Sequence, residues 1–278
     1  MDVRYELLPF ASAEPEAAAV SRPLTLTVTC SPRHGMDHSL EVAGRLSSIG
    51  HSVVLHMAAR MVSGPEHLDS LLKGMADAGI ADVFLVGGDA TDPLGPYTSG
   101  LDLIGELRGH AQAPRSIGVP AYPEGHPLID DITLADALAE KARLADYMTT
   151  QICFDPDALL TWLESTRAAG VDLPLFVGVP GQVNRRKLIE ISMRIGVGGS
   201  IRFIRKQRGV MRLFGRSADP VERLISAASS SSLGIAGFHF FTFNRLVETV
   251  AFVDQRQARQ TVGIASPHPT PTGVATPP

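Results

Sequence analysis

The sequence lacks the marks of a nucleic-acid-binding or membrane protein. Its formal net charge is -4, and it has no basic run longer than Arg185-Arg186-Lys187. It shows no basic stripe with interleaved aromatic residues, the usual footprint of a nucleic-acid-binding face. No apolar run approaches the roughly 18 residues of a membrane span, and Asp2 and Glu6 stand where a signal peptide would have apolar residues. We therefore expect a soluble, cytoplasmic protein whose partner is a small molecule, with neither nucleic acid nor membrane as a partner.

Cysteine is scarce as well. The two cysteines, Cys30 and Cys153, both fall near the ends of predicted strands, where buried free thiols are common. Neither belongs to a CxxC pair, and the histidines and acids show no HExxH or other metal-ligand spacing. The sequence favours free thiols over a disulfide and predicts no metal site.

A strong nucleophile is also missing. No serine with a nearby base is evident, and no lysine lies at a strand end where it would form a Schiff base. The remaining polar groups are carboxylates, amides, hydroxyls and imidazoles, which can orient a flat polar heterocycle and move one proton. This set suits hydride transfer, in which a cofactor carries the electrons and the protein supplies a general acid.

What the sequence does contain is a repeated strand, loop and helix. Eight strand-like runs occupy residues 4–9, 24–30, 53–58, 83–88, 116–121, 147–154, 175–179 and 238–243. Seven of them lead directly into a loop and a helix, which predicts an α/β fold: a single (βα)8 TIM barrel over residues 1–257. The competing architecture, a doubly wound open sheet, would show a glycine-rich phosphate loop after its first strand, and residues 9–23 have no GxGxxG.

Two regions depart from this repeat. Residues 182–233 are longer and more helical than the other connections, which predicts extra helices between the seventh and eighth strands. Residues 258–278 are rich in Pro and Thr and have no periodicity, so we expect a disordered tail.

Polar residues gather where the predicted strands end, and in a barrel those ends carry the active site. The set consists of Glu6, Thr29, His56, Asp89, Tyr122, His126, Gln151 and Asn244. Each of these residues, taken alone, could have a purely structural role. His56 could be a hydrogen-bonded core residue, and Gln151 could satisfy a neighbouring backbone group. Their agreement across many strands is more informative than any one of them, and it indicates a site.

Several of these strand ends carry longer motifs. They are Tyr5-Glu6-Leu7-Leu8-Pro9, Gly88-Asp89, Ala121-Tyr122-Pro123-Glu124-Gly125-His126-Pro127, Thr150-Gln151 with Phe154-Asp155, and Phe238-His239-Phe240 with Thr242 and Asn244-Arg245. In this order, over about residues 4–253, the chain resembles the methylenetetrahydrofolate reductase family. Members of that family are barrel enzymes of one-carbon metabolism and methionine biosynthesis that reduce the methylene bridge of a folate to a methyl group.

The resemblance implies roles for individual residues. Glu6 would be the general acid that helps open the five-membered ring of the folate and protonates the departing nitrogen. Asp89 would bind the amino-pyrimidine edge of the pterin and favour the cationic iminium. Gln151 would hydrogen-bond the folate, and Arg245 would lie near its glutamate carboxylate.

The resemblance also implies cofactors: NAD(P)H, with NADH preferred, as the hydride source, and flavin adenine dinucleotide as the family default. The residues that align with flavin contacts are Thr29, His56, Gly88, Tyr122, His126 and Lys141, the last two being suited to phosphates. The sequence departs from the family at Gly87, where an arginine is usual, and near Leu134 and Ala137, where an acid and an asparagine are expected. It also resembles a flavin-independent branch, in which hydride passes directly from nicotinamide to folate, and both routes stay open.

Two other functions remain as alternatives. A related barrel reductase that uses a deazaflavin and a different pterin would have equal use for Glu6 and Asp89. A catalytically inactive folate-binding barrel would bind folate tightly without turnover. The sequence does not distinguish NADH from NADPH as the hydride donor, and it does not indicate an oligomeric state.

Overall fold

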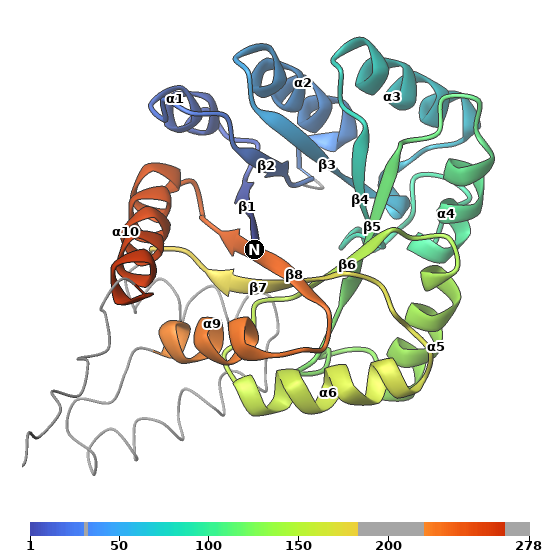
Figure 1. The fold of residues 1–278 in the computed structure, drawn as a ribbon. Helices are drawn as coiled ribbons and strands as arrows, with labels where there is room; N and C mark the ends of the chain where they lie inside the picture. The colour runs from blue at the N-terminus through green and yellow to red at the C-terminus, as the bar shows by residue number, and fades with distance from the viewer. Residues whose placement is uncertain (31–32, 183–219, 265–278) are drawn as a thin grey trace, which may run out of the picture.

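Eight parallel strands close into a barrel in the computed structural model, which describes residues 1–30, 33–182 and 220–264 (Figure 1). The strands are β1 Asp2–Leu7, β2 Thr25–Val28, β3 Ser52–Ala58, β4 Asp82–Val86, β5 Ser116–Ala121, β6 Tyr147–Thr150, β7 Leu175–Pro180 and β8 Ile235–Phe241. Their order around the barrel is their order in the sequence, and β8 pairs with β1. The predicted (βα)8 barrel is confirmed, and the doubly wound alternative is wrong.

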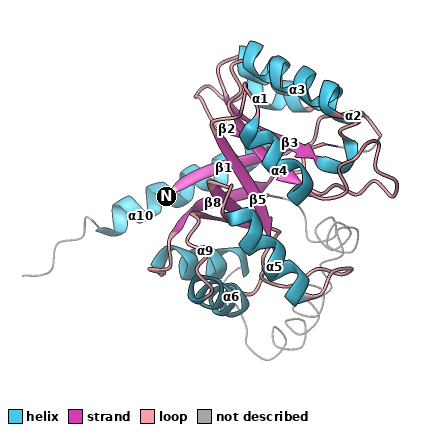
Figure 2. Ribbon diagram, turned by 90° about the vertical axis from the view of Figure 1, so that its right-hand side faces the viewer, coloured by secondary structure: helices cyan, strands magenta, loops and turns pink. Residues whose placement is uncertain are grey.

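The helices lie outside the strands, as Figure 2 shows from the side. They are α1 Ala13–Ala18, α2 Gly35–Ser48, the short 3-10 helix η1 Ala59–Met61, α3 Pro65–Asp77, α4 Gly100–Gly109, α5 Asp131–Ala142, α6 Pro156–Ala168, α9 Pro220–Ser230 and α10 Leu246–Ile264. None of the helices in the described ranges has both the length and the apolar character of a membrane-crossing segment.

Two predicted boundaries are tested only in part. Between β7 and β8 the described residues contain α9, the one helix that each unit of such a barrel has, and the extra helices expected over residues 182–233 would fall on residues 183–219, which lie outside the described residues. The helix α10 continues to Ile264, so the expectation of a disordered tail from residue 258 is wrong as far as that residue. Residues 265–278 also lie outside the description.

Side-chain caps determine where the loops at the carboxyl ends of the strands become helices. Asp155 accepts hydrogen bonds from the backbone N–H groups of Asp157 and Ala158 at the start of α6, and Ser99 and Asp102 form a capping box at the start of α4. These side chains satisfy donors that a helix start leaves open. Loops that hold candidate site residues are thereby fixed at their helical ends.

The core has the expected periodicity. On α3 the buried residues are Leu68, Leu71, Leu72 and Met75, whose i, i+3, i+4 and i+7 spacing puts them on one helical face. On the strands, alternate side chains face the helices, as Tyr5 and Leu7 do, and both are almost fully buried. The other set faces the interior of the barrel.

The interior at the amino-terminal half of the barrel is filled by a polar and aromatic cluster. The guanidinium carbon of Arg4 lies 4.0 Å from the ring centroids of both Tyr147 and Phe176, and Arg4 Nη2 is 3.6 Å from Asp82 Oδ2. The Tyr147 hydroxyl donates a 2.9 Å hydrogen bond to Asp82 Oδ1. Gly118 leaves room for this ring, because a Cβ there would lie 2.2 Å from it. The cluster closes this half of the barrel.

A cavity of about 800 Å³ opens at the same end, lined in part by Arg4, Asp82 and Arg115. It lies at the amino-terminal ends of the strands, whereas barrel enzymes place their chemistry at the carboxyl ends. The candidate site therefore belongs at the carboxyl ends of the strands, on the opposite side of the barrel.

Candidate active site

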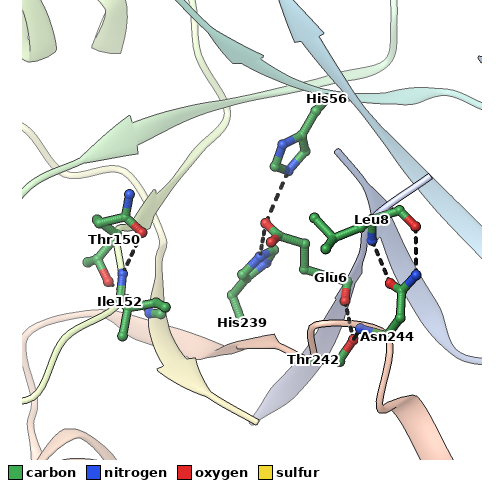
Figure 3. Close-up of polar contacts among 10 residues, drawn as sticks. Glu6, Leu8, His56, Thr150, Ile152, His239, Thr242 and Asn244 are labelled. Atoms are coloured by element: carbon green, nitrogen blue, oxygen red, sulfur yellow. Dashed lines mark hydrogen bonds and ion pairs between the residues drawn. The ribbon is translucent and has the colours of Figure 1, made fainter. Parts of the chain in front are cut away.

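The best-defined group at the carboxyl ends is the carboxylate of Glu6 on β1, with a residue exposure of 8%. In the sheet register Glu6 is beside Thr27 of β2 and Phe241 of β8. His239 Nε2 is 3.3 Å from Glu6 Oε2, and His56 Nε2 is 3.9 Å from the same oxygen. Figure 3 shows both imidazole rings pointing at this one oxygen from opposite sides. Two strands besides β1 thus hold the carboxylate.

His56 is neutral in this setting. Burial, reinforced by the charge of His239, lowers the pKa of His56 to about 3. Its approach to Glu6 is therefore not an ion pair, and among the described residues its buried Nε2 has no hydrogen-bond partner. The buried Oγ1 of Thr27 has none within that set either. Buried polar atoms normally have partners, so these two mark a place for a polar group beside Glu6.

The loop after β8 fixes the end of β1 that carries Glu6. The hydroxyl of Thr242 donates a hydrogen bond to the backbone oxygen of Glu6. Asn244 Oδ1 accepts from Leu8 N at 2.8 Å, and its Nδ2 donates to Leu8 O at 3.0 Å and to Ser12 Oγ at 2.9 Å (Figure 3). Asn244 has a φ of 57°, a conformation that asparagine tolerates better than most residues. The predicted strand-end residue Asn244 therefore has a structural task.

Asp89 lies exposed in the loop between β4 and α4. Burial raises the pKa of Tyr122 to about 12, with a further contribution from the charge of Asp89. Burial lowers the pKa of His126, and Asp89 opposes that shift. Burial also raises the pKa of Cys30 to about 12, and both Asp89 and Glu6 add to this rise. The charges of both carboxylates thus reach Cys30, just after the end of β2.

Tyr122 and His126 remain together, with their ring centroids 5.1 Å apart in an edge-on arrangement. Glu124, between them, accepts hydrogen bonds from the backbone N–H groups of Phe154 and Asp155 at 2.6 and 3.1 Å. This contact joins the loop after β5 to the one after β6. Strand β6 ends at Thr150 and not, as expected, at residue 154.

Gln151 and Arg245 lie at strand ends, and the side chain of each already makes a hydrogen bond within the protein. Gln151 Oε1 accepts a hydrogen bond from Ile152 N at 2.9 Å, which leaves its amide N–H groups to meet a ligand. Arg245 is exposed and donates two hydrogen bonds to Glu248 Oε1, at 3.2 and 2.8 Å. Thr29 is half-buried, and its N–H donates to Leu7 O at 3.0 Å.

The structure does not bring Lys141 to this region. Lys141 is in the last turn of α5, ten residues and about 15 Å along the helix from Asp131. Helices in such a barrel run back towards the amino-terminal ends of the strands, and Asp146, five residues later, bonds to Ile117 at the start of β5. Burial also lowers the pKa of Lys141. The expected phosphate pair of His126 and Lys141 is not formed.

The residues expected to contact a flavin dinucleotide do not fit that group as a set. Its phosphates need cations or several donors, yet Gly87 has no side chain, burial lowers the pKa of His126, and Lys141 lies at the far end of α5. His56 is buried beside Glu6 and neutral. A flavin therefore has no part in the proposed reaction.

The sequence did not single out His239 as a site residue. The signal was present, because in the run FHFFTF this imidazole alternates with Phe238 and Phe240, which face outward into the main apolar core. Strand parity places His239 inside the barrel. Both cysteines are free, as expected, and within the described residues no three His, Cys, Asp or Glu side chains are grouped for a metal ion.

Comparisons with known proteins agree with the motifs. The sequence profile of the family described as methylenetetrahydrofolate reductase matches residues 15–198. Methylenetetrahydrofolate reductase 1 of Schizosaccharomyces pombe is 29% identical over 136 residues, which cover 45% of this chain and 22% of that protein. Methylenetetrahydrofolate reductase (NADH) 1 of Arabidopsis thaliana is 27% identical over 165 residues, 51% of this chain and 27% of that one. Methylenetetrahydrofolate reductase 2 of Saccharomyces cerevisiae is 27% identical over 149 residues, 50% and 25% of the two chains. The chain matches about a quarter of the length of these relatives.

Proposed function

The chain belongs to the methylenetetrahydrofolate reductase family, and on that premise we propose that it reduces 5,10-methylenetetrahydrofolate to 5-methyltetrahydrofolate with hydride from a nicotinamide cofactor. The observation that carries the proposal is the buried carboxyl group of Glu6 at the carboxyl end of β1, which His239 Nε2 contacts at 3.3 Å and His56 Nε2 approaches to 3.9 Å. We propose NADH as the donor, in line with the name of the Arabidopsis relative.

Glu6 is the proposed general acid. The reaction consumes one hydride and one proton, because the folate ring opens to an iminium, a nitrogen departs, and the iminium carbon accepts the hydride. The contact of His239 Nε2 with Oε2 of Glu6, at 3.3 Å, restrains the orientation of the carboxyl group, and the neutral ring of His56 lies beside the same oxygen. A positioned acid of this kind contributes roughly a factor of 10² to 10⁴ to a rate.

Asp89 is the proposed partner of the pterin. Its carboxylate is exposed at the carboxyl end of the barrel, where it can accept hydrogen bonds from an amino-pyrimidine edge and favour a cationic iminium. The free amide N–H groups of Gln151 are proposed to hydrogen-bond the folate. Arg245 would approach the folate glutamate, exchanging its contact with Glu248 for that carboxylate.

We propose that hydride passes directly from the nicotinamide to the folate. The poor fit of Gly87, His126 and Lys141 to a flavin dinucleotide supports this route. The half-buried residues Thr29, Gly88, Tyr122 and His126 are then candidates for contacting the nicotinamide cofactor, since they surround Asp89 or follow neighbouring strands.

The test is NADH oxidation on addition of methylenetetrahydrofolate, under anaerobic conditions, with protein stripped of flavin and none added back. Oxidation with methyltetrahydrofolate as product supports the reductase and direct transfer together. Oxidation only after flavin is restored would contradict direct transfer. Inactivity under both conditions would contradict the reductase and point to the deazaflavin-dependent or folate-binding alternatives.

A further inference from the structure

Arg60 makes several hydrogen bonds to the loop that carries Asp89. Arg60 is in the short helix η1, directly after β3. Its Nε donates a 2.6 Å hydrogen bond to Ala90 O, its Nη2 a 2.6 Å bond to Thr91 O, and its Nη1 a 3.1 Å bond to Thr98 O. Three carbonyl groups of the loop between β4 and α4 are thus bound by one guanidinium group.

The backbone of Arg60 adds two more bonds to the same loop. Its N–H donates to Gly87 O at 3.0 Å, and its carbonyl oxygen accepts from Leu94 N at 2.9 Å. The five bonds reach the loop on both sides of Asp89. Gly88 has a φ of 94°, and a Cβ there would lie 3.0 Å from Ala58 Cβ, so the loop is also packed closely against the end of β3.

Among the described residues, no carboxylate forms an ion pair with the Arg60 side chain. Carbonyl oxygens surround its positive charge instead. A guanidinium group, with five N–H donors in one plane, can bond these three carbonyl groups at once, whereas the ammonium group of a lysine cannot reach them in the same geometry. The arrangement has no evident purpose in closing the barrel, because β3 and β4 already pair through their own ladder from Val54 to Ala58. What it fixes is the loop.

We propose that Arg60 is a positioning residue that holds Asp89 where it binds the pterin. The proposal rests on the proposed function, because the role of Asp89 belongs to that function. Arg60 acts through the loop and does not touch the substrate. Loss of this hold lets the carboxylate move, and a misplacement of about 1 Å at a substrate-binding group can reduce a rate by about 100-fold.

A double-mutant cycle tests this role. We expect Arg60→Ala to lower kcat/KM for methylenetetrahydrofolate by about tenfold or more, with Arg60→Lys nearly as damaging. In an Asp89→Asn background the Arg60→Ala change should have almost no further effect, because the group that it positions is already lost. Equal losses in both backgrounds would overturn the proposal. Ethylguanidine should restore part of the activity of Arg60→Ala.

Arg108→Lys is the matched control. Arg108 also donates Nε to a backbone carbonyl, that of Leu144, and pairs with Asp146 near the opposite end of the barrel. This change should leave kcat/KM unaltered. A similar loss in both lysine variants would mean that Arg60 has only a general structural effect, which contradicts the proposal.

Amide hydrogen exchange gives a readout that does not need activity. In Arg60→Lys, the Leu94 amide and its neighbours in residues 87–99 should exchange faster, while the strands keep their protection. If the wild-type protein shows no turnover, the proposed function fails, yet this exchange result still tests the hold on the loop. Unchanged amide exchange in residues 87–99 would overturn the positioning role of Arg60 and leave the proposed function untouched.

Discussion

At the scale of single residues, the proposed function rests on the buried carboxyl group of Glu6, which lies between two imidazole rings. Glu6 Oε2 is approached by His239 Nε2 at 3.3 Å and His56 Nε2 at 3.9 Å. The pKa of His56, lowered to about 3, keeps this ring neutral at any pH at which the protein would be assayed. We therefore assign no proton transfer in the proposed reaction to His56.

Replacing Glu6 tests the acid directly. We expect Glu6→Gln to reduce turnover by about 100-fold or more, with folate affinity retained, because glutamine keeps the shape of the side chain but has no acidic proton. Steady-state kinetics and folate binding by calorimetry measure the two effects. The exposed Glu164→Gln on α6 is the matched control, and normal turnover in Glu6→Gln would remove this residue from its proposed role.

His239 offers a subtler change. In His239→Phe a ring of similar size replaces the imidazole but cannot hydrogen-bond Glu6. A hydrogen bond of roughly 1 to 1.5 kcal/mol corresponds to about a tenfold loss in kcat. The measurement is kcat at saturating substrate, with thermal unfolding to show that the fold persists. An unaltered kcat in a folded variant would mean that the contact has no catalytic consequence.

Glu6 and Asp89 could be predicted from sequence because a polar residue at the end of an apolar run is conspicuous. His239 and Arg60 were missed for different reasons. His239 meets Glu6 across 233 positions of sequence, through a strand pairing that only barrel closure creates. Arg60 follows an apolar strand as an ordinary turn residue would, and its bonds to three carbonyl groups depend on the path of a distant loop.

At the scale of elements, the corner between β8 and α10 joins the last strand to the first. Three hydrogen bonds from the Asn244 side chain hold Leu8 and Ser12. Because β8 and β1 are the pair that closes the barrel, this corner supports both the closure and the strand that presents Glu6.

We expect Asn244→Ala to lower the free energy of unfolding by about 3 kcal/mol, since it removes three hydrogen bonds of roughly 1 kcal/mol each. Asn244→Gly should cost slightly less, because glycine tolerates the positive φ of this position. Urea denaturation measures both values. A loss below about 0.5 kcal/mol in the alanine variant would show that these bonds contribute nothing net.

Element types were more predictable than element ends. Strand-like runs, most of which lead directly into a loop and a helix, identified all eight strands. The sequence extended β6 to residue 154, yet Phe154 and Asp155 donate their N–H groups to Glu124 of another loop, which no local pattern reveals. The sequence has no periodicity from residue 258 onward, and we therefore expected a disordered tail to begin there. The helix α10 nevertheless continues to Ile264.

At the scale of the whole molecule, the two ends of the barrel have different tasks. The carboxyl ends hold Glu6 and Asp89, while the amino-terminal half is filled by Arg4, Asp82, Tyr147 and Phe176. Burial raises the pKa of Asp82 to about 6, although Arg4 and the Tyr147 hydroxyl oppose the shift. Stability and chemistry should therefore respond to different mutations.

The raised pKa of Asp82 makes a prediction about stability and pH. The folded protein holds this proton more tightly than the unfolded chain does, so the stabilisation by Asp82 is present below about pH 4 and is lost as the pH rises through about 6. Asp82→Asn cannot titrate. The free energy of unfolding of the wild type, minus that of Asp82→Asn, should fall across this window by an amount on the order of 3 kcal/mol. Urea denaturation at several pH values measures it, and a flat or rising difference would contradict the assigned shift.

The measurement that most directly tests the central claim is the fate of a deuterium label at C4 of NADH, placed in turn on each face, with flavin-stripped protein under anaerobic conditions. Direct transfer predicts that one of the two labelled cofactors delivers one deuterium, without loss, into the methyl group of methyltetrahydrofolate, and that Glu6→Gln slows this delivery by about 100-fold or more. NADH oxidation with the label released to water, or a methyl group that gains no deuterium from either cofactor, would contradict the account.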